Sequence, residues 1–142
     1  LGGEFNVALT GAAAGLDANP DFKALLELSN TTFDGASFEA LAPRLRVASL
    51  VITADTAAMH LAVAVGAPTL CLASAAYVGE IVPYAPEITP ANAHFIYTPM
   101  DCQSCLGTCV YPADAGMYPC VAAIDEVQVL AKVDEILRRD GR

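Results

Sequence analysis

One stretch decides the fold of this chain: Leu50-Val-Ile-Thr-Ala-Asp-Thr-Ala-Ala-Met-His-Leu-Ala-Val-Ala-Val-Gly-Ala-Pro-Thr-Leu-Cys-Leu-Ala73. It predicts a strand, a sharp polar turn, a helix and a second strand, which together make a βαβ unit. The first apolar run ends at Asp55, and Thr56 stands at the N-cap position of the helix, so the free N–H groups of residues 57–59 point into the turn. Open α/β sheets bind ligands at the carboxyl ends of their strands. The turn therefore suits an anionic ligand.

The rest of the chain alternates strands with helices in the same way. The expected elements are a strand at 5–10, the small-residue turn Gly11–Gly15, a helix from Asn19 to about Ser29, an edge strand at 31–35, a helix from Ser37 that contains Pro43, a loop with one short helix at 74–86, a strand at 94–97 and a helix at 124–139. The apolar stripe expected on the last helix consists of Val127, Leu130, Val133 and Leu137. Such alternation predicts an α/β, Rossmann-like parallel sheet with helices on both faces.

Composition limits the size and class of the protein. With 142 residues, 55% of them hydrophobic, the chain is long enough for one well-packed domain, and we expect residues 1–142 to form it. A net charge of −9 argues against binding to nucleic acid or an anionic membrane surface. The sequence has neither an apolar run of about 20 residues nor a signal peptide, so we expect a cytoplasmic protein without a transmembrane segment. Because the chain starts at Leu1 without a methionine, we expect an excised fragment or a processed product.

A family resemblance runs through the same stretch. Residues 55–69 read Asp-Thr-Ala-Ala-Met-His-Leu-Ala-Val-Ala-Val-Gly-Ala-Pro-Thr, which resembles the D-T-G-x-M-H-x-A-x-A-x-G-x-P-T signature of glycosyltransferase family 9, the bacterial lipopolysaccharide heptosyltransferases. Pro83-Tyr84, the pair Cys102-x-x-Cys105 and the segment from Ile124 onward fill later positions of the family pattern. The resemblance covers roughly the whole chain. It implies the C-terminal, donor-binding half of a two-domain, GT-B-type enzyme.

The resemblance also implies roles for residues of the polar turn. Asp55 would accept hydrogen bonds from sugar hydroxyls, while Thr56 and the amides of Ala57 and Ala58 would hold the donor phosphates. A simple helix cap is the alternative for Asp55 and Thr56 taken alone. Gly11 belongs to a small-residue loop that the resemblance places beside the donor diphosphate. Ala57 departs from the family glycine, and its methyl group puts donor affinity or donor identity in doubt.

Two further residues of the helix are candidates for the same site. His60 lies one helical turn after Thr56 and on the same face, so its imidazole can reach the same ligand. By resemblance Met59 would lie near the nucleotide base or sugar. The alternatives are a satisfied core histidine and a core methionine. A second departure is the segment 74–76, Ser-Ala-Ala, where the family usually has Gly-Pro-Thr or Gly-Pro-Ser.

The cysteines form a separate group in the loop at 100–121. The spacing Cys102-x2-Cys105-x3-Cys109-x10-Cys120 can close a tetrahedral zinc site. A cytosolic location argues against stable disulfides, which leaves free thiols, a structural zinc ion or an iron–sulfur cluster. Cys71, in the middle of an expected strand, is interpreted as a small core residue.

The family resemblance carries an expected function. It implies transfer of a heptose or related sugar, with inversion, from a nucleotide-diphosphate sugar such as ADP-heptose to a saccharide acceptor of lipopolysaccharide type. The general base and the acceptor groove would belong to an N-terminal domain, so this chain alone would bind donor without turnover, and it assigns no catalytic residue. A helix N-terminus would neutralise the diphosphate, so no divalent cation is expected. Two alternatives remain, a divergent non-catalytic nucleotide-sugar binding domain and a zinc-stapled interaction module.

Overall fold

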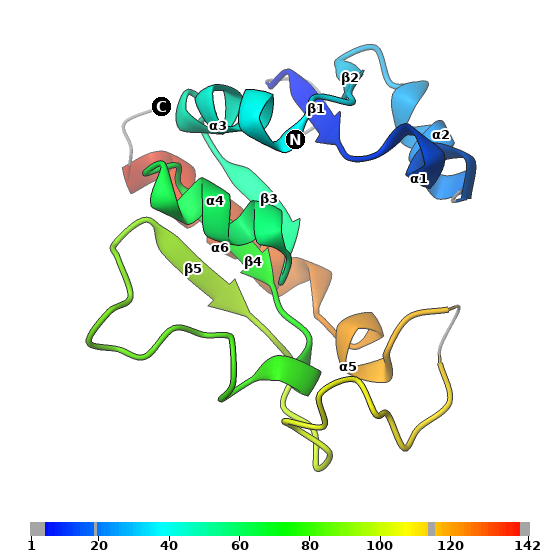
Figure 1. Ribbon diagram of the computed structural model, residues 1–142, viewed down its shortest axis with the longest axis vertical. Coiled ribbons are helices and arrows are strands. Elements are labelled where there is room, and N and C mark those ends of the chain that lie inside the picture. Colours follow the sequence, from blue (N-terminus) through cyan, green and yellow to red (C-terminus); the bar gives the residue numbers. More distant parts are fainter. Residues whose placement is uncertain (1–4, 19, 114–115, 140–142) are drawn as a thin grey trace. The chain divides into compact units, whose positions relative to one another are not determined.

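The computed structural model of the protein describes residues 5–18, 20–113 and 116–139 (Figure 1). The chain divides into two compact units, Leu1–Leu41 and Ala42–Arg142. In the first unit, strands β1 (Val7–Thr10) and β2 (Thr31–Asp34) pair in parallel and are connected through helices α1 (Ala13–Ala18) and α2 (Pro20–Leu26).

The first unit differs from expectation immediately after β1. A turn is expected from Gly11 to Gly15, but α1 already begins at Ala13, since the consecutive alanines favour a helix. The N-cap expected at Asn19 lies outside the described residues. The edge strand expected at 31–35 is confirmed as β2, and β1 is confirmed within its expected range.

Helix α3 (Phe38–Arg46) crosses the boundary between the units and continues through Pro43. The hydroxyl of Ser37 accepts a hydrogen bond of 3.4 Å from the amide of Ala40, which caps the helix as expected. Of its apolar residues, Leu41 and Leu45 are buried.

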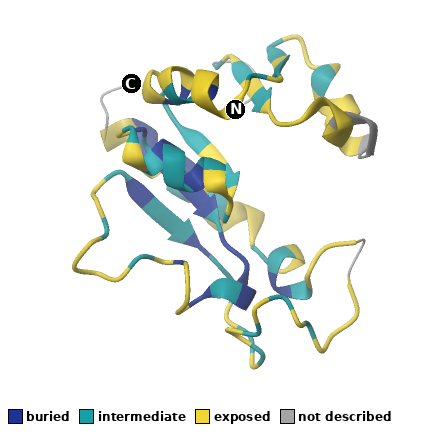
Figure 2. Cartoon of the chain, viewed as in Figure 1, coloured by how far each residue is buried: buried dark blue, intermediate teal, exposed yellow. Residues whose placement is uncertain are grey.

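The second unit contains a three-stranded parallel sheet in the order β3-β4-β5. Its strands are β3 (Val51–Ala54), β4 (Thr69–Leu72) and β5 (Ala93–Ile96). Their first residues are direct partners across the sheet, so the three strands end at the same level. The central strand β4 is buried without alternation, as Figure 2 shows, because both of its faces are covered.

Helices cover the two faces of this sheet, as the fold class predicts. Figure 1 shows α4 (Ala57–Ala64) in front of the strands and α6 (Glu126–Arg139) behind them. Between β4 and β5 lies the short 3₁₀ helix η1 (Ala75–Tyr77), and the short helix α5 (Pro119–Ala122) precedes α6. The short helix expected within 74–86 is confirmed as η1, whereas α5 is not foreseen. No helix among the described residues has the length and apolar character needed to cross a membrane.

The stripe expected on α6 is wrong in its first half. Val133 and Leu137 are buried, but Val127 and Leu130 are 67% and 53% exposed. A strand of four residues spans only about 13 Å, whereas a helix of 14 residues is about 21 Å long. The sheet is therefore too short to cover the whole helix.

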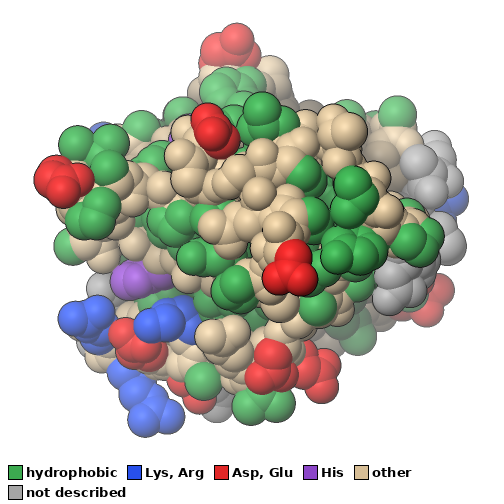
Figure 3. All heavy atoms as spheres, turned by 90° about the horizontal axis from the view of Figure 1, so that it is seen from below, with side chains coloured by type: hydrophobic (Ala, Val, Ile, Leu, Met, Phe, Trp, Pro, Cys, Tyr) green, Lys and Arg blue, Asp and Glu red, His purple; other side chains and the backbone are tan. Residues whose placement is uncertain are grey.

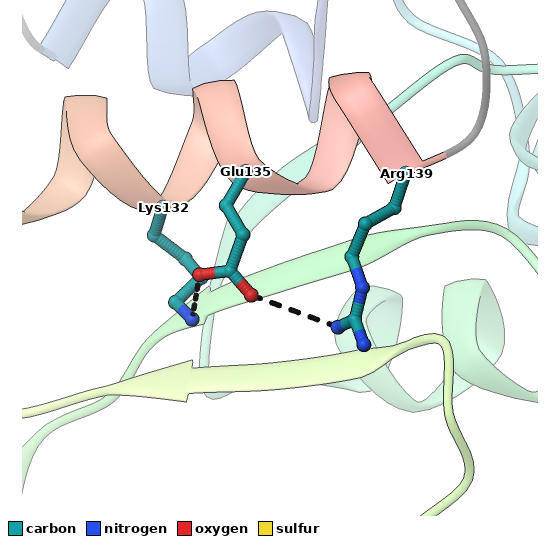
Figure 4. Close-up of polar contacts among 3 residues, drawn as sticks. All are labelled: Lys132, Glu135 and Arg139. Carbon is teal, nitrogen blue, oxygen red and sulfur yellow. Dashed lines mark hydrogen bonds and ion pairs between the residues drawn. The ribbon is translucent and has the colours of Figure 1, made fainter.

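The polar side of α6 carries an ion-pair network (Figure 4). Lys132 donates a hydrogen bond of 2.5 Å to Oε2 of Glu135, and Arg139 lies 3.6 Å from Oε1 of the same carboxylate. The bond from Lys132 is the largest influence on Glu135, and it holds the pKa of that carboxyl below its ordinary value.

Candidate functional site

The turn between β3 and α4 is the centre of the candidate site. Its backbone folds back at once, because the amide of Thr56 donates a 2.8 Å bond to the carbonyl of Ala54. Thr56 is the extended N-cap residue of α4, and its carbonyl accepts bonds from the amides of Met59 (3.0 Å) and His60 (3.4 Å). Its side chain makes no capping hydrogen bond. The N-terminal end of α4 therefore faces out of the sheet at the level where β3 ends.

The amides of Ala57 and Ala58 lie in the first turn of α4, where a helix leaves its N–H groups without intrahelical partners. Ala57 is exposed and Ala58 half-buried, so this helix end is open to solvent. An anion at this end of α4 would meet N–H groups and the positive end of the helix dipole.

Asp55 is half-buried and is connected to the neighbouring strand. Its Oδ2 accepts a hydrogen bond of 3.4 Å from the amide of Ser74, two residues beyond the end of β4. Burial raises the pKa of the adjacent Cys71 thiol to about 12, and the charge of Asp55 contributes to that shift. Cys71 is fully buried, as expected for a small core residue.

Met59 lies in the core and not on the surface of the turn. It is fully buried in a cluster with Cys71, Ala73 and Val82, on which Tyr84 and other aromatic side chains pack. The alternative of a core methionine therefore describes its environment, and the place near a nucleotide base or sugar implied by the resemblance stays a prediction. Met59 is buried because the first turn of α4 packs on β4, where Cys71 and the following Ala73 are small and leave room for a long side chain.

His60 is half-buried and has a defined partner. Its Nδ1 is 2.7 Å from the hydroxyl of Tyr84, which also lies 3.5 Å from Sδ of Met59. The rings of His60 and Tyr84 are tilted at a centroid distance of 5.6 Å, and Tyr84 packs edge-on against Phe95 at 5.3 Å. One imidazole nitrogen is thus occupied within the protein, which limits His60 to its other nitrogen for any ligand.

Ser74 is the residue at this site that the sequence does not point to. It appears there only as a departure from the family's Gly-Pro-Thr pattern, yet it contacts Asp55, the first residue of the signature. It is only 4% exposed, and its hydroxyl accepts a 3.1 Å bond from the amide of Ala76. The available signal is its place after β4, because neighbouring parallel strands bring their carboxyl ends together.

Gly11 follows β1 in the first unit, whereas Asp55 to His60 all belong to the second. Its amide donates a bond of 3.4 Å to the carbonyl of Asp34, which continues the pairing of β1 with β2. A Cβ atom at Gly11 would meet no heavy atom within 4 Å, so the surroundings in the structure would accommodate a side chain there. The predicted place of Gly11 beside the donor diphosphate stays a prediction.

The cysteine loop brings four thiols into one neighbourhood. Cys102, Cys105 and Cys109 are half-buried, Cys120 on α5 is buried, and all four are free. Burial raises the pKa of Cys102, and the charges of the other three thiols raise it further. Nevertheless, no three His, Cys, Asp or Glu side chains among the described residues are placed so that they could hold a metal ion. The fourfold zinc site predicted from spacing is not preformed, so the structure gives no geometric support to that prediction.

A hollow of about 620 Å³ lies at the opposite, amino-terminal edge of the sheet. Arg46, His94 and Arg139 are among its lining residues. Figure 3 shows Lys and Arg side chains gathered beside a histidine on one face of the molecule, with acidic side chains spread more widely. Since Glu135 pairs with Arg139, part of this positive charge is compensated within the protein.

Comparison with known proteins adds the family. A sequence model described as glycosyltransferase family 9 (heptosyltransferase) matches residues 6–108, which is more than half of the chain. No curated protein and no solved structure matches the chain. The matched range contains the β3–α4 turn and the first two cysteines of the loop, Cys102 and Cys105, and it ends before α5 and α6. With its parallel sheets, the covering helices of the second unit and an open helix end at the signature, the chain belongs to glycosyltransferase family 9.

Proposed function

We propose that the chain is the donor-binding part of a glycosyltransferase and that it binds a nucleotide-diphosphate sugar, ADP-heptose in particular, at the β3–α4 turn. The observation that carries the proposal is the exposed N-terminal end of α4 beside a half-buried carboxylate, at the carboxyl end of a parallel strand. Helix N-termini bind phosphates through N–H groups and the helix dipole. A carboxylate beside them suits the hydroxyl groups of a sugar.

In this proposal the parts of the turn have separate tasks. Thr56 and the amides of Ala57 and Ala58 hold the diphosphate, and Asp55 accepts hydrogen bonds from sugar hydroxyls. His60 contacts the same ligand through the nitrogen that Tyr84 does not occupy. Met59 supports the turn from the core. The net charge of −9 makes such a local site necessary, because the surface as a whole repels a diphosphate.

The complete reaction requires more than this chain. We propose that the sugar is transferred to a saccharide acceptor of lipopolysaccharide type, with the general base and the acceptor groove on an N-terminal domain. The chain alone would then bind donor without turnover. Because α4 would stabilise the departing diphosphate, transfer would proceed without a divalent cation, and a dependence of full-length activity on magnesium would count against this part of the proposal.

Calorimetric titration of the chain with ADP, ADP-heptose, UDP and GDP tests the site. We expect saturable binding of ADP and ADP-heptose. Asp55→Ala should weaken the binding of ADP-heptose about 10-fold or more, and Thr56→Ala should weaken the binding of both ligands by a similar factor. Asp134→Ala and Thr32→Ala are matched controls, because they make the same changes at exposed positions on α6 and β2 and should leave the affinities unchanged. Equal affinities for all variants would refute the site.

Two alternative functions lead to different results. A divergent, non-catalytic nucleotide-sugar binding domain would bind the donor, but the full-length protein would not transfer the sugar. A zinc-stapled interaction module would contain stoichiometric zinc and lose partner binding on chelation. Metal analysis of the purified chain, with a Cys102→Ser, Cys105→Ser double variant as the control, measures the second alternative directly.

A further inference from the structure

Ser74 is buried beside the candidate donor turn, and both its backbone and its side chain have partners. Its amide donates to Oδ2 of Asp55 at 3.4 Å. Its hydroxyl accepts a 3.1 Å bond from the amide of Ala76 and lies 3.6 Å from Sγ of Cys120, which is also buried. The side chain of Ser74 is thus held by η1 and α5, while its backbone amide points toward the carboxylate of Asp55.

The cysteine loop supports this arrangement. The carbonyls of Ala75 and Ala76 in η1 accept hydrogen bonds of 2.9 Å from the amides of Ser104 and Leu106. Ser104 and Leu106 have φ angles of 65° and 52°. Residues other than glycine rarely adopt this left-handed backbone conformation, and they keep it where the surrounding structure stabilises it. The loop therefore anchors η1 through two backbone bonds, and η1 in turn fixes Ser74.

A carboxylate held in this way is prepared for a ligand. An ionised Asp side chain has about four acceptor sites on its two oxygens. The bond from Ser74 occupies one of them and leaves Asp55 able to accept from hydroxyl groups. Because the rotamer is already restricted, less side-chain entropy is lost when the ligand binds.

We propose that Ser74 is a positioning residue that fixes the carboxylate of Asp55 for a sugar hydroxyl through its backbone N–H group. The proposal rests on the proposed function, in which Asp55 binds the sugar of the donor. It also gives the cysteine loop a role that needs no metal, since the loop keeps η1 and Ser74 in place.

A proline substitution removes the N–H group, and an alanine substitution is its control. Ser74 has φ −73°, which proline adopts, so Ser74→Pro keeps the backbone angle; it also removes the hydroxyl, and its ring carbon takes the place of the N–H proton, so the Asp55 carboxylate must turn away. Ser74→Ala removes the hydroxyl and keeps the donor. We expect Ser74→Pro to weaken ADP-heptose binding about tenfold, the lower end for a bond to a charged group because 3.4 Å is long. The affinity for ADP, which lacks the heptose that Asp55 would bind, should stay unchanged. Ser74→Ala should lose less affinity for ADP-heptose than Ser74→Pro does.

A double-mutant cycle completes the test. If Ser74 acts through Asp55, adding Ser74→Pro to Asp55→Ala causes no further loss of sugar-nucleotide affinity. Equal losses for ADP and ADP-heptose in Ser74→Pro, or additive losses in the double variant, would overturn the proposal. If Asp55→Ala weakens ADP-heptose binding but folded Ser74→Pro does not, Ser74 has no positioning role and the proposed function stands. If the unsubstituted chain binds none of the nucleotides, the proposed function itself fails.

A second measurement covers the case in which Ser74→Pro does not fold. In ¹H–¹⁵N spectra of the chain, the Ser74 amide proton should move upfield when Asp55→Ala removes its acceptor. An unmoved resonance would show that the hydrogen bond is absent in solution and would overturn the proposal independently of ligand binding.

Discussion

Replacement of Met59 by alanine should destabilise the second unit strongly. The side chain is fully buried among Cys71, Ala73 and Val82, so Met59→Ala removes its apolar contacts and leaves a cavity. Buried Met→Ala changes cost about 2–5 kcal/mol. The hydroxyl of Tyr84 loses its 3.5 Å contact with Sδ but keeps His60 at 2.7 Å, so the cavity dominates the loss.

The assay is urea unfolding followed by far-UV circular dichroism, with Met59→Leu as the control. Met59→Ala should lower the free energy of unfolding in urea by about 3 kcal/mol, which in a thermal scan of the same variant lowers Tm by roughly 12–24 °C. The near-isosteric Met59→Leu should cost less than about 1.5 kcal/mol. A free energy of unfolding for Met59→Ala within about 1 kcal/mol of the unsubstituted chain would refute the core position of Met59. The surface position beside the ligand would then be the better interpretation.

Three further predictions concern titration and the aromatic cluster. Burial raises the pKa of Cys71 from 9.0 to about 12, so the folded state keeps the thiol protonated at pH values where the unfolded state has lost the proton. The contribution of this thiol to stability is therefore complete below pH 9 and is lost as the pH rises toward 12. The free energy of unfolding measured against pH should show this loss, and Cys71→Ala should remove it. Lys132→Met should raise the pKa of Glu135 toward its ordinary value in a ¹³C carboxyl titration, and an unchanged pKa would mean that the bond does not persist in solution. Tyr84→Phe should cost about 1 kcal/mol in urea unfolding, because it leaves Nδ1 of His60 without its partner, and no cost would place that nitrogen in contact with water.

The sequence predicts the local parts of this fold well. The βαβ unit from Leu50 to Ala73 has nearly the expected bounds. Its apolar runs, its polar turn, and Gly66 and Pro68 between the helix and the second strand each indicate the local structure within a few residues. Helix α6 is located correctly for the same reason. Its exposed first half is not predicted, since helical periodicity does not reveal the length of the sheet beneath the helix.

The candidate site is predicted only where it is local. Asp55, Thr56 and the start of α4 follow from the signature, whereas the contact of Asp55 with Ser74 depends on which strand lies beside β3. Helix α5 has four residues, too few to show a period, so the burial of Cys120 could not be foreseen. Cysteine spacing predicts a metal site, but spacing does not set the directions of the thiols.

The contact of Ser74 with Cys120 has a consequence for synthesis of the protein. Along the chain the two residues are separated by 46 positions, although their side chains are 3.6 Å apart. The complete signature therefore leaves the ribosome well before α5, and a nascent or truncated chain ending before Pro119 has every signature residue without the contact of Ser74 with Cys120. Since long-range contacts form late in folding, Ser74 gains this last part of its support only after α5 has docked.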